Sequence, residues 1–521
     1  MSIPSLRQES ATDNGVQPPP IHRLSDDLLA SIVSEVLKVT NTAELLISPT
    51  HPLINATHVS HSWRRVLLDS ALLWTDIRIV TPSPVPPPQH DPKEGDCVVD
   101  VEVLRSQWTR QMKVLPELVT TWINRSSTCP ISLFLNMHAP LSRYASPETR
   151  EIIWPYYVST LSAICNASSK WKDVTLHISL DSPDLSQAAS LIHGLQSSDV
   201  PLLEALSMRL SSASGGGDTR HIPTSANGIQ MGSALLSLRI PYTECRWEDY
   251  HANWSALTSL EVLGFTLETS GTAPGTPAKR MGLLEVLALL RACPNLVKLS
   301  MQINRRHPVD TEEELSAAQP VELPRLRTLV FSMGGLPPWA HLACYLVLPA
   351  LRELQFHSDV DMYALKHWVS VFGKGLTSVR LVLGRDVSTE DVEEILDRLP
   401  NVRSLRCMTE SCAVGTDALV LRTLTPKYTP GGYVVGTCRC PKLENILYAQ
   451  RDQIPESTIL DFVESRRNVA SSGVAMLEEV YTWSGQTDAL TSDLEAELRK
   501  RGVNTGGLSI TMAPHLRNRL Y

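Results

Sequence analysis

The segment PALRELQF, residues 349–356, belongs to a pattern that recurs along the chain. Each copy reads Pro-x-Leu-x-x-Leu-x-(apolar), with Val or Ile replacing a Leu at some positions. Because successive side chains of a strand point to opposite faces, the end of the block predicts a short strand with one apolar face. The other copies that begin with proline are PLLEALSM (201–208), PNLVKLSM (294–301), PRLRTLVF (324–331), PNVRSLRC (400–407) and PKLENILY (441–448).

Amphipathic helices are predicted between these blocks. Ser388 and Asp391 have the spacing of a helix-capping pair, and Val392, Ile395 and Leu396 follow on one helical face. Proline then often ends the helix before the next strand, because it lacks the N–H that a helix interior needs. The repeated unit is therefore a helix, a frequent proline stop and a short strand.

The spacing of the blocks predicts a repeat architecture. Copies without the proline keep the same apolar spacing, as at Leu376, Val379 and Leu381. The first apolar residues Leu326, Leu351, Leu376 and Val402 follow one another at intervals of 25, 25 and 26 residues, while the other intervals range from 22 to 41. Leucine-rich repeats have periods of about 20–29 residues, and stacking buries the apolar edge that a single unit leaves open. We expect an α/β leucine-rich-repeat solenoid, with parallel strands on the concave face and helices on the convex face. The alternative is ordinary strand–helix alternation in a closed parallel-sheet fold.

Composition narrows the class of protein. The chain has 521 residues, of which 43% are hydrophobic, and a net charge of −8. It can bury a substantial core, and its acidic balance argues against a nucleic-acid partner. No uncharged apolar run reaches the roughly 18 residues that span a bilayer, and the N-terminus lacks the apolar core of a secretory signal. With ten scattered Cys, the sequence predicts a cytoplasmic and/or nuclear protein with no membrane partner.

Composition also divides the chain into segments. We expect a disordered leader at 1–20, a compact apolar block at 21–80, a proline-rich linker or loop at 81–97, connecting helices and a strand at 98–165, and the repeats at 166–521. The stretches 211–220 and 268–280 are interpreted as flexible loops inserted into the repeats.

The block at 21–80 predicts a small helical unit. Ser25 has the position of an N-cap, two aspartates follow it in the first turn, and an apolar periodic run continues through 28–37. A second helix is expected at about 53–68. A unit of about 60 residues is marginal by itself, so apolar residues beyond its own core would need a partner.

This block resembles an F-box. The family pattern begins Leu-Pro-x-Glu-(Leu/Ile)-(Leu/Ile), continues through a Val-Cys-(x)-x-Trp-Arg helix and closes with Pro-x-Leu-Trp. The chain has LSDDLL at 24–29, VSHSWR at 59–64 and LLW at 72–74, with an insertion at 41–52. It departs from the pattern by Ser25 for Pro, Asp27 for Glu, Ser60 for Cys and Ala71 for Pro. Residues 115–137 are similar to the segment that follows the F-box in fungal F-box proteins with degenerate leucine-rich repeats.

The resemblance implies a docking role. F-box proteins bind a Skp-type adaptor, which joins them to a cullin scaffold, and their C-terminal domain presents a protein substrate for ubiquitination. The chain would then be the non-catalytic substrate-recognition subunit of an SCF-type ubiquitin ligase. The alternative is a leucine-rich-repeat scaffold that retains the F-box but acts outside a ligase. The expected adaptor-binding residues are Leu24, Leu28, Leu29, Ile32, Val59, Trp63, Leu73 and Trp74.

A substrate surface is expected on the strands. The residues that alternate with the apolar positions should face outward and form ladders on stacked repeats. They form a modestly basic set with Glu353 as its acidic exception, which favours an acidic or phosphorylated partner. The expected substrate-binding residues are Arg209, Arg239, Lys298, Gln302, Gln355, His357, Arg380 and Arg406.

No catalytic motif is found. The sequence contains no GxxxxGK[ST], GxSxG or HExxH. His58 and His61 have no third ligand near them in sequence, and the four cysteines between 407 and 440 lack the Cys-x-x-Cys spacing of a zinc pair. We therefore expect no enzyme activity, no bound metal and no cofactor.

Overall fold

The computed structural model consists of two compact units, Met1–Ile178 and Ser179–Tyr521. The leader at 1–20, most of the linker at 81–97 and the loop at 268–280 lie outside the described residues. The structure describes residues 24–40, 51–82, 101–138, 147–180, 182–212, 228–242, 247, 251–264, 283–303, 317–333, 342–357, 361–384, 387–409, 418–428, 434–435, 438–450, 454–468, 474–484 and 493–513.

The first unit begins with helices and continues as alternating strands and helices. Its last strand, β3, crosses the boundary between the units by two residues. The elements are α1 (Asp26–Thr40), α2 (Pro52–Thr57), α3 (His61–Asp69), η2 (Ala71–Trp74), β1 (Asp76–Val80), α4 (Val101–Arg125), β2 (Ile131–His138), α5 (Pro147–Asn166), η3 (Ser168–Lys170) and β3 (Trp171–Leu180).

The second unit alternates short strands with helices or turns. Its helices and 3-10 turns are α6 (Ser182–His193), η4 (Ser197–Asp199), η5 (Ile229–Met231), η7 (Trp254–Ala256), α7 (Leu283–Ala292), α9 (Met362–Phe372), η9 (Gly373–Gly375), α10 (Thr389–Asp397), α11 (Leu419–Leu424), α12 (Glu456–Arg467) and α13 (Leu494–Lys500). Its strands are β4 (Ala205–Ser212), β5 (Ser237–Tyr242), β6 (Ser259–Gly264), β7 (Lys298–Ile303), β8 (Val321–Glu322), β9 (Thr328–Met333), β10 (Leu346–Val347), β11 (Glu353–Phe356), β12 (Ser378–Leu383), β13 (Ser404–Thr409), β14 (Lys427–Tyr428), β15 (Val434–Val435), β16 (Asn445–Gln450), β17 (Glu479–Ser484) and β18 (Ser509–Ala513).

The main sheet is large and parallel. It has 14 strands, and within the second unit they follow the order β4-β5-β6-β7-β9-β11-β12-β13-β16-β17-β18. Two small sheets accompany it, the parallel pair β10-β8 and the antiparallel pair β14-β15. The expected α/β class, with a parallel sheet and helices, is confirmed.

The strand register explains why the sequence block recurs. Leu329, Leu354, Val379, Leu405 and Ile446 occupy one row across β9, β11, β12, β13 and β16. Each of these side chains is at most 2% exposed. Burying one such aliphatic side chain stabilises a protein by about 1.5–3 kcal/mol. A strand of this length cannot cover its own inward side chains, so each strand depends on the next one in the row.

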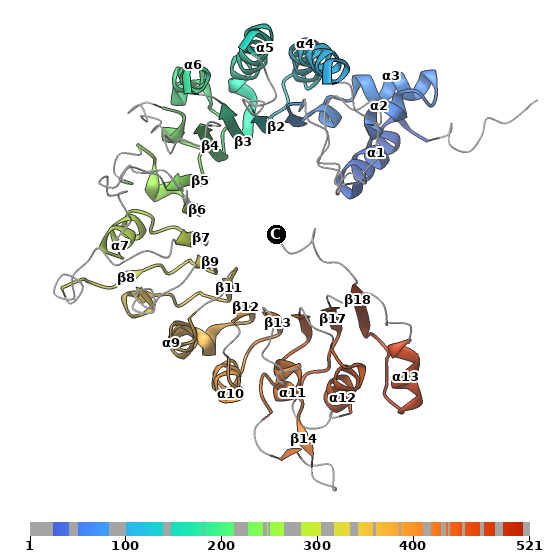
Figure 1. The fold of residues 1–521 in the computed structure, drawn as a ribbon, viewed down its shortest axis with the longest axis vertical. Coiled ribbons are helices and arrows are strands. Elements are labelled where there is room, and N and C mark those ends of the chain that lie inside the picture. Colours follow the sequence, from blue (N-terminus) through green and yellow to red (C-terminus); the bar gives the residue numbers. More distant parts are fainter. Residues whose placement is uncertain are drawn as a thin grey trace, which may run out of the picture. The chain divides into compact units, whose positions relative to one another are not determined.

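Helices cover one face of the strands in the second unit. Figure 1 shows α9, α10, α12 and α13 on the same side of the strands that precede and follow them. Leu365, Trp368 and Val369 on α9 are buried, as their helical spacing predicts, and the Trp368 ring lies 4.8 Å from that of Phe331 on β9. The described helices of this unit leave the opposite face of the strands uncovered.

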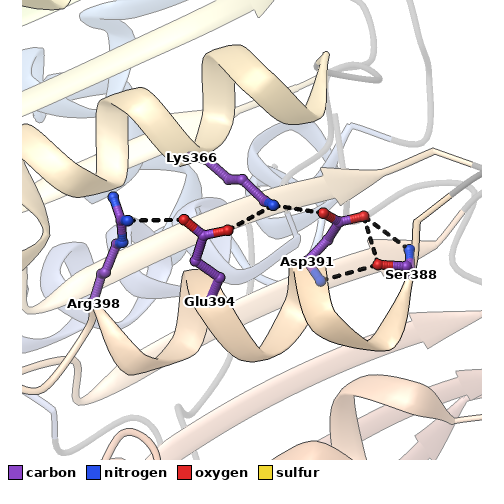
Figure 2. A network of polar contacts seen from close by, with 5 residues as sticks. All are labelled: Lys366, Ser388, Asp391, Glu394 and Arg398. Atoms are coloured by element: carbon purple, nitrogen blue, oxygen red, sulfur yellow. Dashed lines mark hydrogen bonds and ion pairs between the residues drawn. The ribbon is translucent and has the colours of Figure 1, made fainter.

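Charged side chains join neighbouring helices on the outer side. Figure 2 shows the ammonium group of Lys366 on α9 between two carboxylates of α10, 2.6 Å from Asp391 and 2.6 Å from Glu394. Arg398 pairs with the second carboxylate at 2.8 Å. Asp391 also forms the capping box with Ser388 that the sequence predicts. Hydrogen bonding to Lys366 lowers the pKa of Asp391, and the same carboxylates raise the pKa of Lys366.

Arg466 and Arg467, the last two residues of helix α12, are buried. The Arg466 side chain is 1% exposed and donates to the carbonyl oxygens of Leu424 (3.1 and 2.9 Å) and Cys440 (3.0 Å). Arg467 donates to the carbonyls of Asn504 and Leu477. Cys440 has φ 46°, a left-handed conformation that costs energy in a residue with a Cβ. Arg466 therefore holds a strained turn against the helix by satisfying its buried carbonyl.

Gly373 allows α9 to approach the end of α10. A Cβ built at this position would lie 2.3 Å from the carbonyl oxygen of Arg398, closer than real contacts allow. We expect Gly373→Ala to lower the free energy of unfolding by about 1–3 kcal/mol, the usual cost of forcing extra atoms into packed structure. Gly375→Ala is the matched control, because its Cβ would meet Leu351 at 3.4 Å. Chemical denaturation that gives equal stabilities for the two variants would contradict the close approach.

Candidate functional site

An exposed apolar stripe runs along helix α1. Leu28, Ile32 and Val36 are 55%, 46% and 44% exposed, and their spacing of four residues puts them on one helical face. Leu29 and Val33 on the same helix are 5% exposed and pack inward. The helix therefore divides its apolar residues between a core face and an outer face. Ser25 caps its first turn by accepting from the N–H of Leu28.

Two further apolar side chains are exposed in the same helical block. Val59, after α2, is 59% exposed, and Leu72, in η2, is 76% exposed. Isolated exposed aliphatic residues are common, but a stripe of them on one helix face is typical of interaction surfaces. Val36 and Leu72 were not among the residues expected from the sequence. Val36 continues the four-residue spacing, which was the available signal, whereas Leu72 could not be told from its neighbour Leu73.

Trp74 holds the block to helix α4. Its side chain is fully buried, and its indole N–H donates to the carbonyl of Leu67 at 2.9 Å. The Trp122 ring contacts it edge-on at 4.7 Å between centroids, and the Arg125 guanidinium lies over it at 4.4 Å. Aromatic and cation–π contacts of this kind add to the free energy that apolar burial supplies. The block and the first long helix therefore share one core.

The structure divides the expected adaptor-binding set into three groups. Leu28, Ile32 and Val59 are exposed, and Leu24 and Trp63 are partly exposed. Leu29, Leu73 and Trp74 are buried at 5%, 7% and 0% exposure, so in this structure they belong to the core of the block and are not surface contacts. Trp74 packs against Trp122, which is far away in the sequence.

A second candidate surface lies on the helix-free face of the strands. Arg239 is in register with Glu261, and Gln355 with Arg380, which is in turn in register with Arg406. Of the expected substrate-binding residues, Arg209, Lys298, His357 and Arg406 are exposed, Arg239 and Gln355 are partly exposed, and Arg380 is 9% exposed. Gln302 lies in β7, and its side chain is outside the described part of the structure.

The helix-free face of the strands is less basic than the sequence suggests. Glu353 was expected as the acidic exception, but Glu261 is paired in register with Arg239, and their side chains form an ion pair at 3.3 Å. Glu479 is an exposed acidic residue in register with Asn445 and Ser509. The expectation of a single acidic exception is therefore wrong. Glu261 lies between Leu260 and Val262, which keep the apolar spacing without the leading proline, so its place on this face could have been read from the sequence.

Side chains on β9, on β11 and just after β11 form a hydrogen-bonded chain centred on the Glu353 carboxylate. Thr328 donates to Glu353 at 3.0 Å, and the Gln355 amide donates to the other carboxylate oxygen at 2.7 Å. His357 Nε2 lies 3.1 Å from Gln355 Oε1, which accepts, and 3.5 Å from Arg380 Nη1, which donates. Burial, and then the charge of Arg380, lower the pKa of His357. The hydrogen-bonded side chains therefore place the His357 imidazole beside the Arg380 guanidinium.

The residues considered as metal ligands have other partners. His58 Nδ1 lies 3.2 Å from Arg64 Nη2, and Cys440 Sγ lies 3.7 Å from the carbonyl oxygen of Leu396. Burial raises the pKa of the Cys440 thiol to about 12. Within the described ranges, no three His, Cys, Asp or Glu side chains are arranged to hold a metal ion. Among the described helices, none combines the length and the apolar character needed to cross a bilayer.

Comparison with known proteins gives a distant structural likeness. No family model and no curated protein matches the sequence. Among solved structures, a protein from Bacteroides fragilis determined by the Northeast Structural Genomics Consortium aligns at 14% identity with a TM-score of 0.28. The alignment covers 54% of this chain and 66% of that chain, which is just under two thirds of its length.

His51 gives the helical block a pH dependence. Its Nδ1 caps α2 by accepting from the N–H of Leu53 at 3.2 Å, and its ring lies 5.2 Å from that of Trp122. Burial lowers its pKa from 6.5, while Asp76 opposes the shift. As pH falls through 6.5, the unfolded chain therefore takes up the proton first, and stability decreases toward the folded-state pKa. Protonation also removes the capping acceptor.

We expect hydrogen exchange in residues 51–69 to show faster opening at pH 5.5 than at pH 7, after correction for intrinsic exchange rates. His51→Asn keeps a capping side chain but does not titrate, so it should reduce this difference. His61→Asn, at an exposed position, should leave it unchanged. An undiminished pH effect in His51→Asn would show that His51 is not its source.

Proposed function

We propose that this chain is the non-catalytic substrate-recognition subunit of an SCF-type ubiquitin ligase. Residues 21–80 would be an F-box that docks a Skp-type adaptor, and the adaptor would connect the chain to a cullin scaffold. The observation that carries the proposal is the outer apolar stripe of α1, formed by Leu28, Ile32 and Val36. It occurs in the same block whose LSDDLL, VSHSWR and LLW segments resemble the family pattern.

The stripe supports docking because it is separate from the core. Leu53 and Leu67 are fully buried, and Val33 and Val66 are nearly so, so the block keeps an apolar interior without the exposed residues. Covering a large aliphatic side chain yields about 1.5–3 kcal/mol, and three on one helix face can enter a groove together. A partner could therefore bind this face without rearranging the block.

The repeat region would be a leucine-rich-repeat solenoid over residues 166–521. Three observations support this finer assignment: the 25- and 26-residue spacing of Leu326, Leu351, Leu376 and Val402, the parallel register, and the helices on a single face. The uncovered strand face would bind the protein substrate. Arg380 and Arg406 lie side by side there, and such pairs suit carboxylate or phosphate groups. We place this activity in the cytoplasm or nucleus, in protein degradation.

The adaptor surface is tested by Leu28→Ala with Ile32→Ala. Both side chains are exposed, so the fold should persist, while truncating interface hot spots typically costs about 2 kcal/mol or more each. We expect co-precipitation with a Skp-type adaptor to fall at least tenfold. The matched control is Val103→Ala with Val114→Ala on α4, which removes similarly exposed apolar groups and should leave binding unchanged.

The outcomes separate the two candidate functions. Unchanged adaptor binding by a well-folded double variant would contradict the F-box assignment. Adaptor binding by the wild-type chain without recovery of a cullin in the same complex would favour the scaffold that acts outside a ligase.

A further inference from the structure

A continuous backbone ladder precedes the strands of the second unit. The residue just before a strand accepts two hydrogen bonds with its carbonyl oxygen. The donors are the N–H groups of the residue just before the next strand and of that strand's first residue. The carbonyl of Arg327 accepts from the N–H of Arg352 at 2.9 Å and from that of Glu353 at 2.9 Å, and the same pattern links Arg352 to Thr377. This hydrogen bonding fixes these residues in one row along the N-terminal ends of the strands. The row is Glu204, Leu236, Thr258, Val297, Arg327, Arg352, Thr377, Arg403, Glu444 and Glu478.

The side chains of this row change character along its length. Leu236 and Val297 are apolar and 43% and 36% exposed. Exposed arginines follow at 327 and 352, and a third at 403 forms an ion pair with Glu444 at 3.3 Å. After acidic Glu204, and apart from Thr258 and Thr377, the row therefore passes from apolar to basic and then to charge-paired and acidic positions.

Two more cations join the basic part of the row. Arg325 is exposed two residues before Arg327. The Arg352 guanidinium donates to the carbonyl of Gly375 at 3.4 Å, beside the exposed Lys374. We call Arg325, Arg327, Arg352 and Lys374 the basic edge. Within the described part of the chain none of the four forms an ion pair, although exposed Glu322 is near Arg325 in sequence.

The size of the basic edge limits what it can bind. Neighbouring strands lie about 4.8 Å apart, so the row from Val297 to Arg352 spans about 10 Å, the length of about three residues of extended polypeptide. A long polyanion such as a nucleic acid would extend along the row past the basic edge to exposed Glu478, where like charges repel it. A short peptide that combines carboxylates with an apolar side chain matches both the basic edge and exposed Val297.

We propose that the basic edge is a docking site for a short acidic segment of a partner protein, with carboxylates on Arg327 and Arg352 and an apolar side chain on Val297. Arg pairs with carboxylates in bidentate geometry, and the four exposed cations, on a chain of charge −8, attract such a segment electrostatically. The site is distinct from the outer stripe of α1 and does not depend on adaptor binding.

The test is a binding titration of the full chain with a fluorescein-labelled peptide of alternating glutamate and leucine, followed by anisotropy. The control peptide has glutamine for glutamate. We expect the glutamate peptide to bind at least tenfold more tightly than the control, with weaker binding at high salt. Arg327→Glu with Arg352→Glu should weaken binding at least tenfold, and so should Arg325→Glu with Lys374→Glu, which changes residues that donate no side-chain hydrogen bond within the described part.

A charge-matched variant controls for net charge. Arg110→Glu with Lys113→Glu reverses two exposed cations on α4 and should bind the peptide within twofold of wild type. Equal loss in that variant, equal binding of the glutamine peptide, or no binding by wild type would overturn the proposal. Tighter binding of a single-stranded oligonucleotide would also overturn it.

Discussion

The second unit depends on the in-register contact between buried aliphatic side chains on neighbouring strands. Leu354 packs in a row with Leu329 on one side and Val379 on the other, and none of the three is exposed to solvent. A strand of four to six residues covers too little surface to be stable by itself. The sequence block is therefore conserved in spacing from repeat to repeat, while the residues between its apolar positions are free to vary.

The variable positions between the apolar ones are those whose side chains remain available to contact a partner. The inward positions are committed to the core, the outer helix sides carry ion pairs such as that of Lys366 with Asp391, and the remaining positions face solvent on the strands or along their leading edge. The first unit likewise divides its side chains between the core and the surface. Helix α1 uses Leu29 and Val33 for the core and leaves Leu28 and Ile32 outside.

The sequence predicted the repeated strands and the capping of α10 because both depend on local spacing. It could not divide Leu28 from Leu29, since both are apolar and the division depends on packing of the block as a whole. The burial of Trp74 depends on Trp122, which is 48 positions later. Proline was expected to end helices, yet α4 and α5 continue through Pro116 and Pro155. Buried Arg466 was also missed, because its partners are backbone carbonyls that leave no mark in the sequence.

The central claim is that the outer face of α1 contacts the adaptor. Site-specific photo-crosslinking tests it most directly, with a benzophenone amino acid placed at Ile32 or, as the comparison, at Tyr363 on α9, which is 63% exposed. In a complex of the full chain with a Skp-type adaptor, position 32 should crosslink to the adaptor and position 363 should not. An adaptor that co-elutes with the chain but crosslinks from position 363 and not from position 32 would contradict the account.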